Sequence, residues 1–238
     1  MAGGLQSGVP MTTTRLLHHF PLDPASRQAR LALGEKKLGF VDRPVRYWEL
    51  DEAFHALSPS GMTPVLEVIE PKDRLVVCEL PAVLDWIETF HAEPPLLARD
   101  AAERAEALRL RQWFDRKFEV EVDSLILFER MEKRLQRLGS PEAAPLRQGR
   151  EALRWHLAYL ERLLGERDWL AGRAMSQADL AAAGHLSVLD YFGEVAWDAH
   201  PQLKTWYMRL KSRPAFRPLL QDRLPGMAPA AHYAELDF

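Results

Sequence analysis

The sequence predicts an α+β protein in which a β-α-β-α-β-β-α domain is followed by an all-α helical domain. Two observations carry this prediction. Short apolar runs bounded by turn residues occur only before about residue 92, whereas the chain beyond residue 101 is rich in Ala, Leu, Glu and Arg and shows no strand pattern. The proline-containing segment EPPLL at residues 93–97 separates the two patterns and is typical of a linker. We therefore expect a flexible extension at 1–13, domains at 14–92 and 103–222, a linker at 93–102 and a tail at 223–238.

Composition and charge exclude several classes of protein. With 47% hydrophobic and 27% charged residues among 238, the chain has enough apolar surface for a folded core. A net charge of −3, with no nucleic-acid-reading motif, argues against a nucleic-acid partner. No apolar run reaches the roughly 18 residues of a membrane-spanning helix, and no secretory signal is recognisable at the start. We expect a cytoplasmic protein without a membrane span.

The single cysteine, Cys78, and the scattered histidines predict no metal site. One cysteine forms no internal disulfide and builds neither an iron–sulfur cluster nor a cysteine-rich zinc site. His18 and His19 are adjacent on a predicted strand and so face opposite ways, and no His-x-x-x-His pair occurs. We expect no metal and no cofactor.

The first elements have clear local signals. The short apolar run at residues 16–20 suits a buried strand. Asp23 and Pro24 form an N-cap followed by proline at the first helical position, which predicts a helix from Pro24 to Leu38 that stops at Gly39. The remaining elements of this domain are a strand over 41–48, a short helix or turn over 49–57, strands over 64–69 and 75–78, and a helix over 82–90.

The second domain is predicted to be entirely helical. Strong helix formers fill residues 101–138, and Gly139, Ser140 and Pro141 then break the pattern. Ser176 and Asp179 have the spacing of a capping box, with Asp in the usual place of Glu, and so predict the start of another helix. The remaining helices are expected over 143–165, 176–192, 203–211 and 215–221. The stretch 224–238 mixes Pro, Ala and Gly without a period.

Four local features stand at informative places. Ser26 lies in the first turn of the first helix, Thr63-Pro64 enters the third strand, Glu79 follows the fourth strand, and Ser176-x-x-Asp179 opens a helix. Each also has a structural interpretation: Ser26 can satisfy backbone donors at a helix start, Pro64 can end a loop, and Glu79 can favour a helix N-terminus. Their order over residues 15–222 resembles the cytosolic glutathione transferases, whose thioredoxin-like domain precedes an all-helical domain.

The resemblance implies a role for each of these residues. The Ser26 hydroxyl would stabilise the glutathione thiolate. Pro64 would be cis and would expose the backbone of Thr63 to the peptide part of glutathione. Glu79 would hold the γ-glutamyl amine. Ser176 and Asp179 would form a structural cap that supports folding.

One position departs from this family. The family usually has a serine after the acidic residue, and its hydroxyl binds the γ-glutamyl carboxylate, whereas this chain has Leu80 after Glu79. Loss of a charge-assisted hydrogen bond costs about 1.5–3 kcal/mol, or roughly 10- to 150-fold in affinity. We therefore expect glutathione to bind weakly or not at all.

The two ends of the chain are similar to a narrower family. The run from His19 to Arg27 (HFPLDPASR) and the end from Pro225 to Phe238 (PGMAPAAHYAELDF) resemble the glutathione-transferase-like cell-division proteins of alphaproteobacteria that bind FtsZ. This resemblance implies a homodimeric, non-catalytic binding protein at the division site. It also implies that FtsZ filaments are the partner and that the protein helps to couple them to septal wall synthesis.

The tail and Trp48 are candidate partner-binding sites. In the tail, Tyr233, Leu236 and Phe238 are apolar, and Glu235 and Asp237 stand between them. The tail is either a strap packed on its own domain or a linear motif with aromatic anchors. Trp48 is either a core residue or an anchor beside the ligand cleft. Because the domain pattern ends near Gln221, we expect deletion of 233–238 to leave the folded body intact.

Local charge adds a second indication of a protein partner. Residues 130–154 contain seven basic and three acidic side chains, and residues 201–217 contain five basic side chains and no acid. Such runs form solvated helix faces or attract an acidic partner. The function expected from the sequence is an FtsZ-binding adaptor on a glutathione transferase fold. The alternative is a glutathione S-transferase that uses Ser26.

Overall fold

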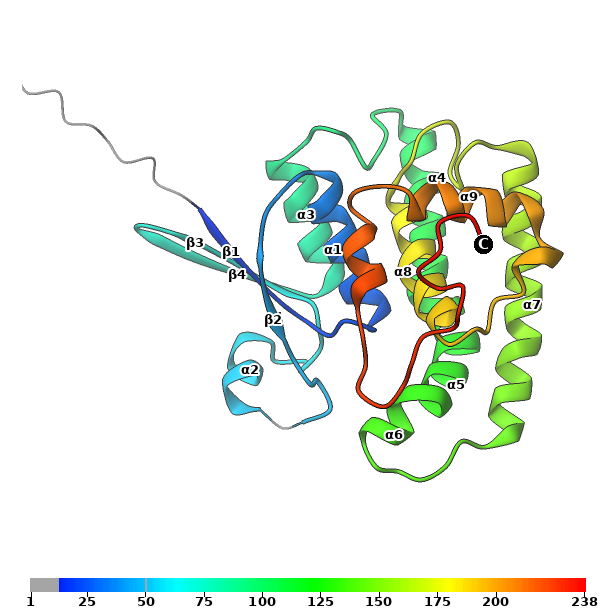
Figure 1. The fold of residues 1–238 in the computed structure, drawn as a ribbon. Helices are drawn as coiled ribbons and strands as arrows, with labels where there is room; N and C mark the ends of the chain where they lie inside the picture. Colours follow the sequence, from blue (N-terminus) through cyan, green and yellow to red (C-terminus); the bar gives the residue numbers. More distant parts are fainter. Residues whose placement is uncertain (1–12, 50) are drawn as a thin grey trace, which may run out of the picture.

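A four-stranded sheet in the order β2-β1-β3-β4 forms the centre of the N-terminal domain in this computed structural model, which describes residues 13–49 and 51–238 (Figure 1). β1 pairs in parallel with β2 and antiparallel with β3, and β3 and β4 form a hairpin. Residues 1–12 of the predicted extension lie outside the described part of the chain. The strands are β1 (Thr14–His19), β2 (Val41–Pro44), β3 (Val65–Glu70) and β4 (Asp73–Cys78).

The first helix, α1 (Pro24–Glu35), begins as predicted and ends earlier than predicted. The Asp23 side chain accepts hydrogen bonds from the backbone N–H groups of Ala25 and Ser26. At the other end Lys37 adopts a left-handed conformation with φ 56°, and the Leu38 N–H donates to the Leu33 carbonyl at 2.8 Å. This closing pattern usually has glycine at the left-handed position. The predicted stop at Gly39 was therefore wrong, because a lysine takes that position.

The second strand is also shorter than predicted: it ends at Pro44, whereas the prediction extended it to Trp48. β2 is exposed at the edge of the sheet, and its last pair joins Pro44 to His19, the final residue of β1. The Val45 N–H still donates to the His19 carbonyl at 2.8 Å, and the ladder stops there because β1 ends at His19. Two further helices complete this domain, α2 (Glu52–Leu57) and α3 (Leu80–Phe90).

The helical domain is built around α8 (Gln177–Tyr191), which is buried along its whole length and contacts both α1 and α4. The predicted helix over 101–138 is an almost continuous rod that ends at Leu135, and π-helical turns interrupt it over Trp113–Asp123 and Phe128–Glu132. Such turns often mark functional sites. The other helices are α4 (Ala101–Gln112), α5 (Ser124–Leu127), α6 (Lys133–Leu135), α7 (Ala143–Glu166) and α9 (Pro201–Lys211), with short 3-10 turns at Trp197–Ala199 and Arg217–Gln221.

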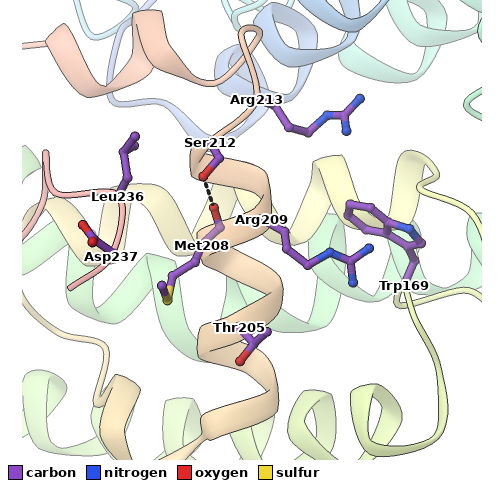
Figure 2. Close-up of a pocket in the computed structure, with 8 residues that line it drawn as sticks. All are labelled: Trp169, Thr205, Met208, Arg209, Ser212, Arg213, Leu236 and Asp237. Atoms are coloured by element: carbon purple, nitrogen blue, oxygen red, sulfur yellow. Dashed lines mark hydrogen bonds between the residues drawn. The ribbon is translucent and has the colours of Figure 1, made fainter.

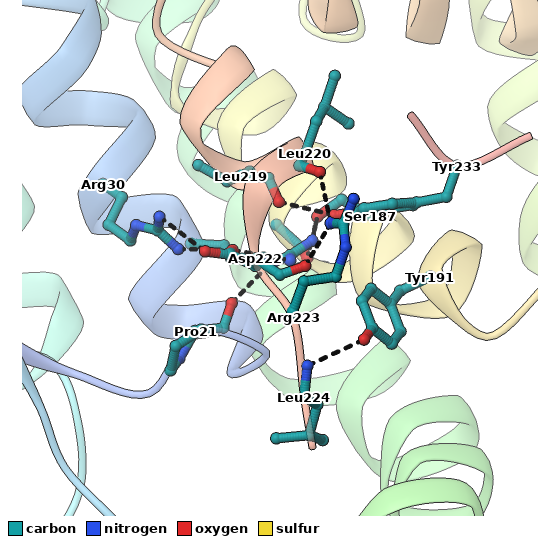
Figure 3. Close-up of polar contacts among 12 residues, drawn as sticks. Pro21, Arg30, Ser187, Tyr191, Leu219, Leu220, Asp222, Arg223, Leu224 and Tyr233 are labelled. Carbon is teal, nitrogen blue, oxygen red and sulfur yellow. Dashed lines mark hydrogen bonds and ion pairs between the residues drawn. The ribbon is translucent and has the colours of Figure 1, made fainter. Parts of the chain in front are cut away.

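Buried ion pairs join the two domains. Arg27 of α1 is fully buried and donates to the Pro21 carbonyl at 2.8 Å, to Ser187 at 2.8 Å and to Asp222 at 3.0 Å. Arg30 binds the same Asp222 carboxylate at 2.8 and 3.1 Å (Figure 3). Because these contacts connect α1 to the segment after the last helical turn, the C-terminal residues hold the domains together.

The tail packs on its own domain. Tyr233 is fully buried, and its hydroxyl donates to the Leu219 carbonyl at 2.9 Å. The Tyr191 hydroxyl donates to the Met227 carbonyl at 2.6 Å, and the Ala230 N–H donates to the Tyr191 carbonyl at 2.8 Å. The strap interpretation therefore holds for residues 224–233. The expectation that deletion of 233–238 removes little of the core was wrong, because the aperiodic sequence conceals a buried aromatic anchor.

Of the helices in the described ranges 13–49 and 51–238, none combines the length and the apolar character needed to cross a membrane.

Candidate functional site

The site residues predicted in the N-terminal domain meet at one edge of the sheet. In the strand register Val65 lies opposite both His18 and Cys78, so the end of β1, the start of β3 and the end of β4 are neighbours. This arrangement brings together the start of α1, the Thr63-Pro64 peptide and Glu79, which stand at those strand ends. The Thr63-Pro64 peptide bond is cis.

Asp23 is the centre of the hydrogen bonding at the start of α1. Its Oδ2 atom accepts from the Ser26 N–H at 2.9 Å, from the Ser26 hydroxyl at 2.6 Å and from the Thr63 hydroxyl at 2.8 Å. Ser26 is fully buried, and its Oγ also accepts from the Phe20 N–H at 3.2 Å. The hydroxyl of Ser26 is therefore engaged within the protein. The sequence identified Asp23 only as a cap, since nothing local shows that Thr63 reaches it.

Glu79 and Leu80 begin α3 in contrasting ways. Glu79 is exposed and has φ 72°, in the left-handed region that most side chains avoid, and its side chain makes no capping hydrogen bond. The adjacent Leu80 is 7% exposed and belongs to the hydrophobic core. The start of α3 thus presents a carboxylate to solvent but no hydroxyl beside it.

The helical domain adds acidic groups near Asp23. The Tyr47 hydroxyl donates to Glu132 at 3.2 Å. Burial, followed by the carboxylates of Asp23 and Asp123, raises the pKa of Glu132 although Tyr47 opposes the shift. Burial also raises the pKa of Glu119, as do Asp123, Asp115 and Asp23 against the opposing charge of His185. Carboxylates of the helical domain therefore lie within electrostatic reach of Asp23. The sequence did not reveal this grouping, because its members are far apart in the chain.

A buried imidazolium partly balances these acids. His185 of α8 bonds to Asp123 through Nδ1 and lies 3.8 Å from Asp115 through Nε2. Burial opposes its charge, but Asp123 and Asp115 outweigh that effect and raise the pKa of His185 to about 10. Gln28 of α1 lies 3.3 Å from the same ring and donates to Asp115 at 3.0 Å. This cluster ties the N-terminal domain to the π-helical turns.

Trp48 belongs to an aromatic group that includes Phe20, which lies just before the start of α1. Its ring meets Phe20 edge to face at 5.1 Å and Tyr47 edge to face at 5.1 Å, and Phe20 also contacts Tyr47 at 5.8 Å. Trp48 is partly buried, so part of its surface contributes to the core and part stays accessible. A partly buried tryptophan is compatible with either interpretation of this residue.

The last residues of the tail border an open groove. Figure 2 shows Leu236 and Asp237 on one side of α9 and Trp169 on the other. Together with residues of α9 they line a groove with a volume of about 800 Å³. Leu236 is partly buried, and Glu235 and Asp237 are exposed. Phe238 packs on Trp197 at 5.5 Å, with the Lys211 ammonium 4.1 Å from its ring centroid. The predicted partner-binding residues after Tyr233 are therefore at or near the surface, whereas Tyr233 is not.

The predicted basic faces are neutralised in part. In the second run Arg213 forms a two-point pair with Glu35 at 2.6 Å for each contact, Lys204 binds Asp198 at 2.7 Å, and Lys211 is buried. In the first run Arg130 and Arg150 share Glu194 at 3.1 and 2.7 Å. Charge counted along the sequence overstated the exposed positive charge, because the acidic partners come from other elements.

Ser176 and Asp179 form the predicted capping box at the start of α8. Asp179 is fully buried and accepts from the Ser176 N–H at 2.8 Å. It also accepts from the Leu170 N–H at 3.0 Å and from the Trp206 indole at 2.9 Å. Asp179 thus joins α8 to the preceding loop and to α9, a wider structural role than a cap.

Family comparisons agree with this architecture. Residues 24–89 match the glutathione S-transferase N-terminal domain, and residues 123–214 match the glutathione S-transferase C-terminal domain. The chain is 64% identical over 228 residues to FtsZ-localized protein A of Caulobacter vibrioides, which covers 96% of this chain and 100% of that protein.

Solved structures give the same result. FzlA from C. crescentus superposes with a TM-score of 0.93 at 65% identity, covering 94% of this chain and 100% of that one. A glutathione S-transferase from Rhodospirillum rubrum F11 superposes with a TM-score of 0.91 at 43% identity, with the same coverage. The fold therefore consists of a thioredoxin-like domain followed by a helical domain, as predicted.

Proposed function

Because this chain belongs to the glutathione S-transferase-fold family that includes FtsZ-localized protein A, we propose that it is a non-catalytic cell-division adaptor that binds FtsZ. The 64% identity across nearly the full length carries this proposal. The protein would act in the cytoplasm, at the division site, and would help to couple FtsZ filaments to septal wall synthesis.

The groups at the starts of α1 and α3 support the non-catalytic part of the proposal. A serine that stabilises a thiolate must direct its hydroxyl at the sulfur. In this chain the Ser26 hydroxyl is buried and donates to Asp23. Leu80 offers no hydroxyl for the γ-glutamyl carboxylate. The alternative, a glutathione S-transferase that uses Ser26, is favoured by the retained Ser26 and Glu79, by the cis Thr63-Pro64 peptide and by the similarity to a glutathione S-transferase from Rhodospirillum rubrum F11.

We place the partner contacts at two surfaces. Trp48 supplies an aromatic surface on the N-terminal domain, and such residues often dominate binding energies. Glu235, Leu236, Asp237 and Phe238 form the outer part of the tail, which is suited to a second contact, with FtsZ or with the wall-synthesis machinery. Tyr233 then acts by holding the strap in place.

We also propose that the protein is a homodimer, as its family resemblance implies. Two aromatic surfaces lie on different domains and support this. On α3, Phe90 is 66% exposed and stacks on Trp86 at 5.4 Å. On the helical domain, Trp155 of α7 is 54% exposed and stacks on Trp113 at 5.6 Å. Pairing of one protomer's N-terminal domain with the other's helical domain would cover both surfaces under two-fold symmetry.

Co-pelleting with polymerised FtsZ, run beside a glutathione-affinity column, tests the proposed function. We expect the protein to pellet with FtsZ assembled in GTP and to pass through the glutathione column. Trp48→Ala should reduce the pelleted fraction. Val41→Ala is the control, because Val41 is an apolar residue of the same domain whose surface is 45% exposed. Failure to pellet, together with retention on the column, would favour the transferase alternative.

A further inference from the structure

The Asp23 carboxylate is bound by the donors that surround the start of α1. One of its oxygens accepts hydrogen bonds from the Ser26 N–H, the Ser26 hydroxyl and the Thr63 hydroxyl, at 2.9, 2.6 and 2.8 Å. The other oxygen accepts from the Ala25 N–H at 3.3 Å. A helix N-terminus with two hydroxyl donors is a favourable environment for a negative charge. In this chain that environment is already occupied by a residue of the chain itself.

The Asp23 carboxylate lies among the groups that the family resemblance assigns to glutathione. Thr63 precedes the cis proline, and Ser26 is the residue whose hydroxyl the family resemblance assigns to a thiolate. Both hydroxyls donate their hydrogen bonds to Asp23. A thiolate in the same place would lose these donors and would also lie beside a carboxylate, which disfavours a second negative charge.

We infer that Asp23 is a specificity-determining residue that prevents the groups at the start of α1 from stabilising a thiolate. The inference deepens the proposed non-catalytic function and rests on it. Asp23 and Leu80 act on different parts of glutathione: Asp23 accepts a hydrogen bond from the Ser26 hydroxyl that the resemblance assigns to the sulfur, whereas Leu80 offers no hydroxyl for the γ-glutamyl carboxylate. Restoring serine at position 80 therefore improves attachment of the peptide part without lowering the pKa of the thiol.

The nearby acids act in the same direction. Asp23 is among the carboxylates that raise the pKa of Glu132 and of Glu119, so these groups sense its negative charge. Acidic groups gathered in this way disfavour an additional anion. Removal of the Asp23 charge weakens the hydrogen bonds that its side chain accepts from the two hydroxyls and removes one of these negative charges.

Binding of glutathione to charge-neutral variants tests the inference. In a Leu80→Ser background, Asp23→Asn keeps the shape and one acceptor oxygen of the cap. Compared with the Leu80→Ser parent, we expect the double variant to bind glutathione at least tenfold more tightly by calorimetry. The pKa of the bound thiol should also be lower than in the parent, as measured by thiolate absorbance across pH 5–9. The affinity for S-methylglutathione, which has no ionisable thiol, should increase less than threefold.

Asp51→Asn is the matched control. Asp51 caps α2 through the Ala53 and Phe54 N–H groups at 2.9 and 3.3 Å, and no hydroxyl of residues 13–49 or 51–238 donates to it. The Asp51→Asn substitution should leave the affinity for glutathione unchanged. Equal affinities in the Asp23→Asn and Asp51→Asn variants, or an equal gain for S-methylglutathione, would overturn the inference. Asp23→Ser provides a second variant, judged by the same readouts, if the amide disturbs folding.

The two proposals fail separately in this design. Co-pelleting with FtsZ is measured on the same Asp23→Asn protein and should match that of its Leu80→Ser parent. Loss of pelleting in the wild type bears on the adaptor proposal alone, whereas an unchanged thiol pKa bears on Asp23 alone.

Discussion

Single buried charges are supported in this protein by partners from distant elements. Lys211 is fully buried, and its ammonium lies 4.1 Å from the Phe238 ring centroid and 3.4 Å from the His232 carbonyl. Burial lowers the pKa of Lys211. His185 is in the opposite situation, since two carboxylates keep its imidazolium charged despite complete burial. Such residues are sensitive points, because removal of one partner leaves the other charge uncompensated.

The His185 cluster predicts a pH dependence of stability. Its pKa is raised to about 10 in the folded protein, against about 6.5 in an unfolded chain. Its stabilising contribution is therefore fully present below pH 6.5 and is lost as pH rises toward 10. The slope approaches about 1.4 kcal/mol per pH unit for one proton. Urea unfolding at pH 6.5, 8 and 9.5 should show a steeper decline for the wild type than for His185→Gln. Parallel declines would contradict this assignment.

The α8 capping box predicts unequal effects of its two residues. Ser176→Ala removes one cap and should cost about 0.5–2 kcal/mol of unfolding free energy. Asp179→Ala also leaves the Leu170 N–H and the Trp206 indole without their partner, so its cost should exceed about 3 kcal/mol. Chemical denaturation measures both values. Equal costs would show that the contacts of Asp179 beyond the cap contribute little.

At the scale of elements, the tail and the π-helical turns connect parts of the fold that the local sequence does not relate. The strap over 224–233 returns across α8, and Tyr233 anchors it beneath the last helical turn. The π-helical turns direct Asp115 and Asp123 toward His185 of α8. Both elements contribute to the interface between the domains as well as to the helical domain itself.

The strap predicts that stability and partner binding separate within the tail. Tyr233→Ala removes a fully buried aromatic ring and a hydrogen bond, and should cost about 3–5 kcal/mol. Leu236→Ala lies at the groove and should change stability by less than about 1 kcal/mol. Thermal melting compares the stability of the two variants. Division of cells that carry each variant as their only copy compares their function. A division defect in Leu236→Ala with a normal melt would support docking by the tail, whereas normal division would restrict the tail to its role as a strap.

At the scale of the whole molecule, the hydrophobic core runs through both domains, and the ion pairs of Arg27, Arg30 and Arg213 cross between them. The protomer is therefore a single rigid support for surfaces that lie on different domains. The aromatic pairs Trp86–Phe90 and Trp113–Trp155 remain open on this support. Exposed aromatic groups of this kind usually mark an interaction surface.

The dimer proposal predicts that charges at these aromatic surfaces produce monomers. Phe90→Asp and Trp155→Asp should each reduce the mass measured by light scattering at micromolar concentration, because a buried unpaired carboxylate opposes association. Val41→Asp is the control, since Val41 lies on β2 at the opposite edge of the sheet from β4. A monomeric wild type, or an unchanged mass in both variants, would contradict the proposed dimer.

Local patterns determined the order of the elements and several of their boundaries. Asp23-Pro24 defined the start of α1, Ser176 and Asp179 defined the start of α8, and apolar runs located all four strands. These features succeeded because caps, turns and alternation depend on residues a few positions apart. The end of α1 was missed, since Lys37 holds a backbone conformation that its residue type does not signal.

Only the tertiary structure decided which side chains share a site. Ser26 was predicted from its position, but whether its hydroxyl faces a ligand depends on Asp23 and on Thr63, which lies 40 residues from Asp23 along the chain. The burial of Tyr233 depends on Leu219 and Tyr191, and the neutralisation of Arg213 depends on Glu35, 178 residues away. Burial and pairing are properties of contacts between distant segments, so composition and spacing along the chain contain no record of them.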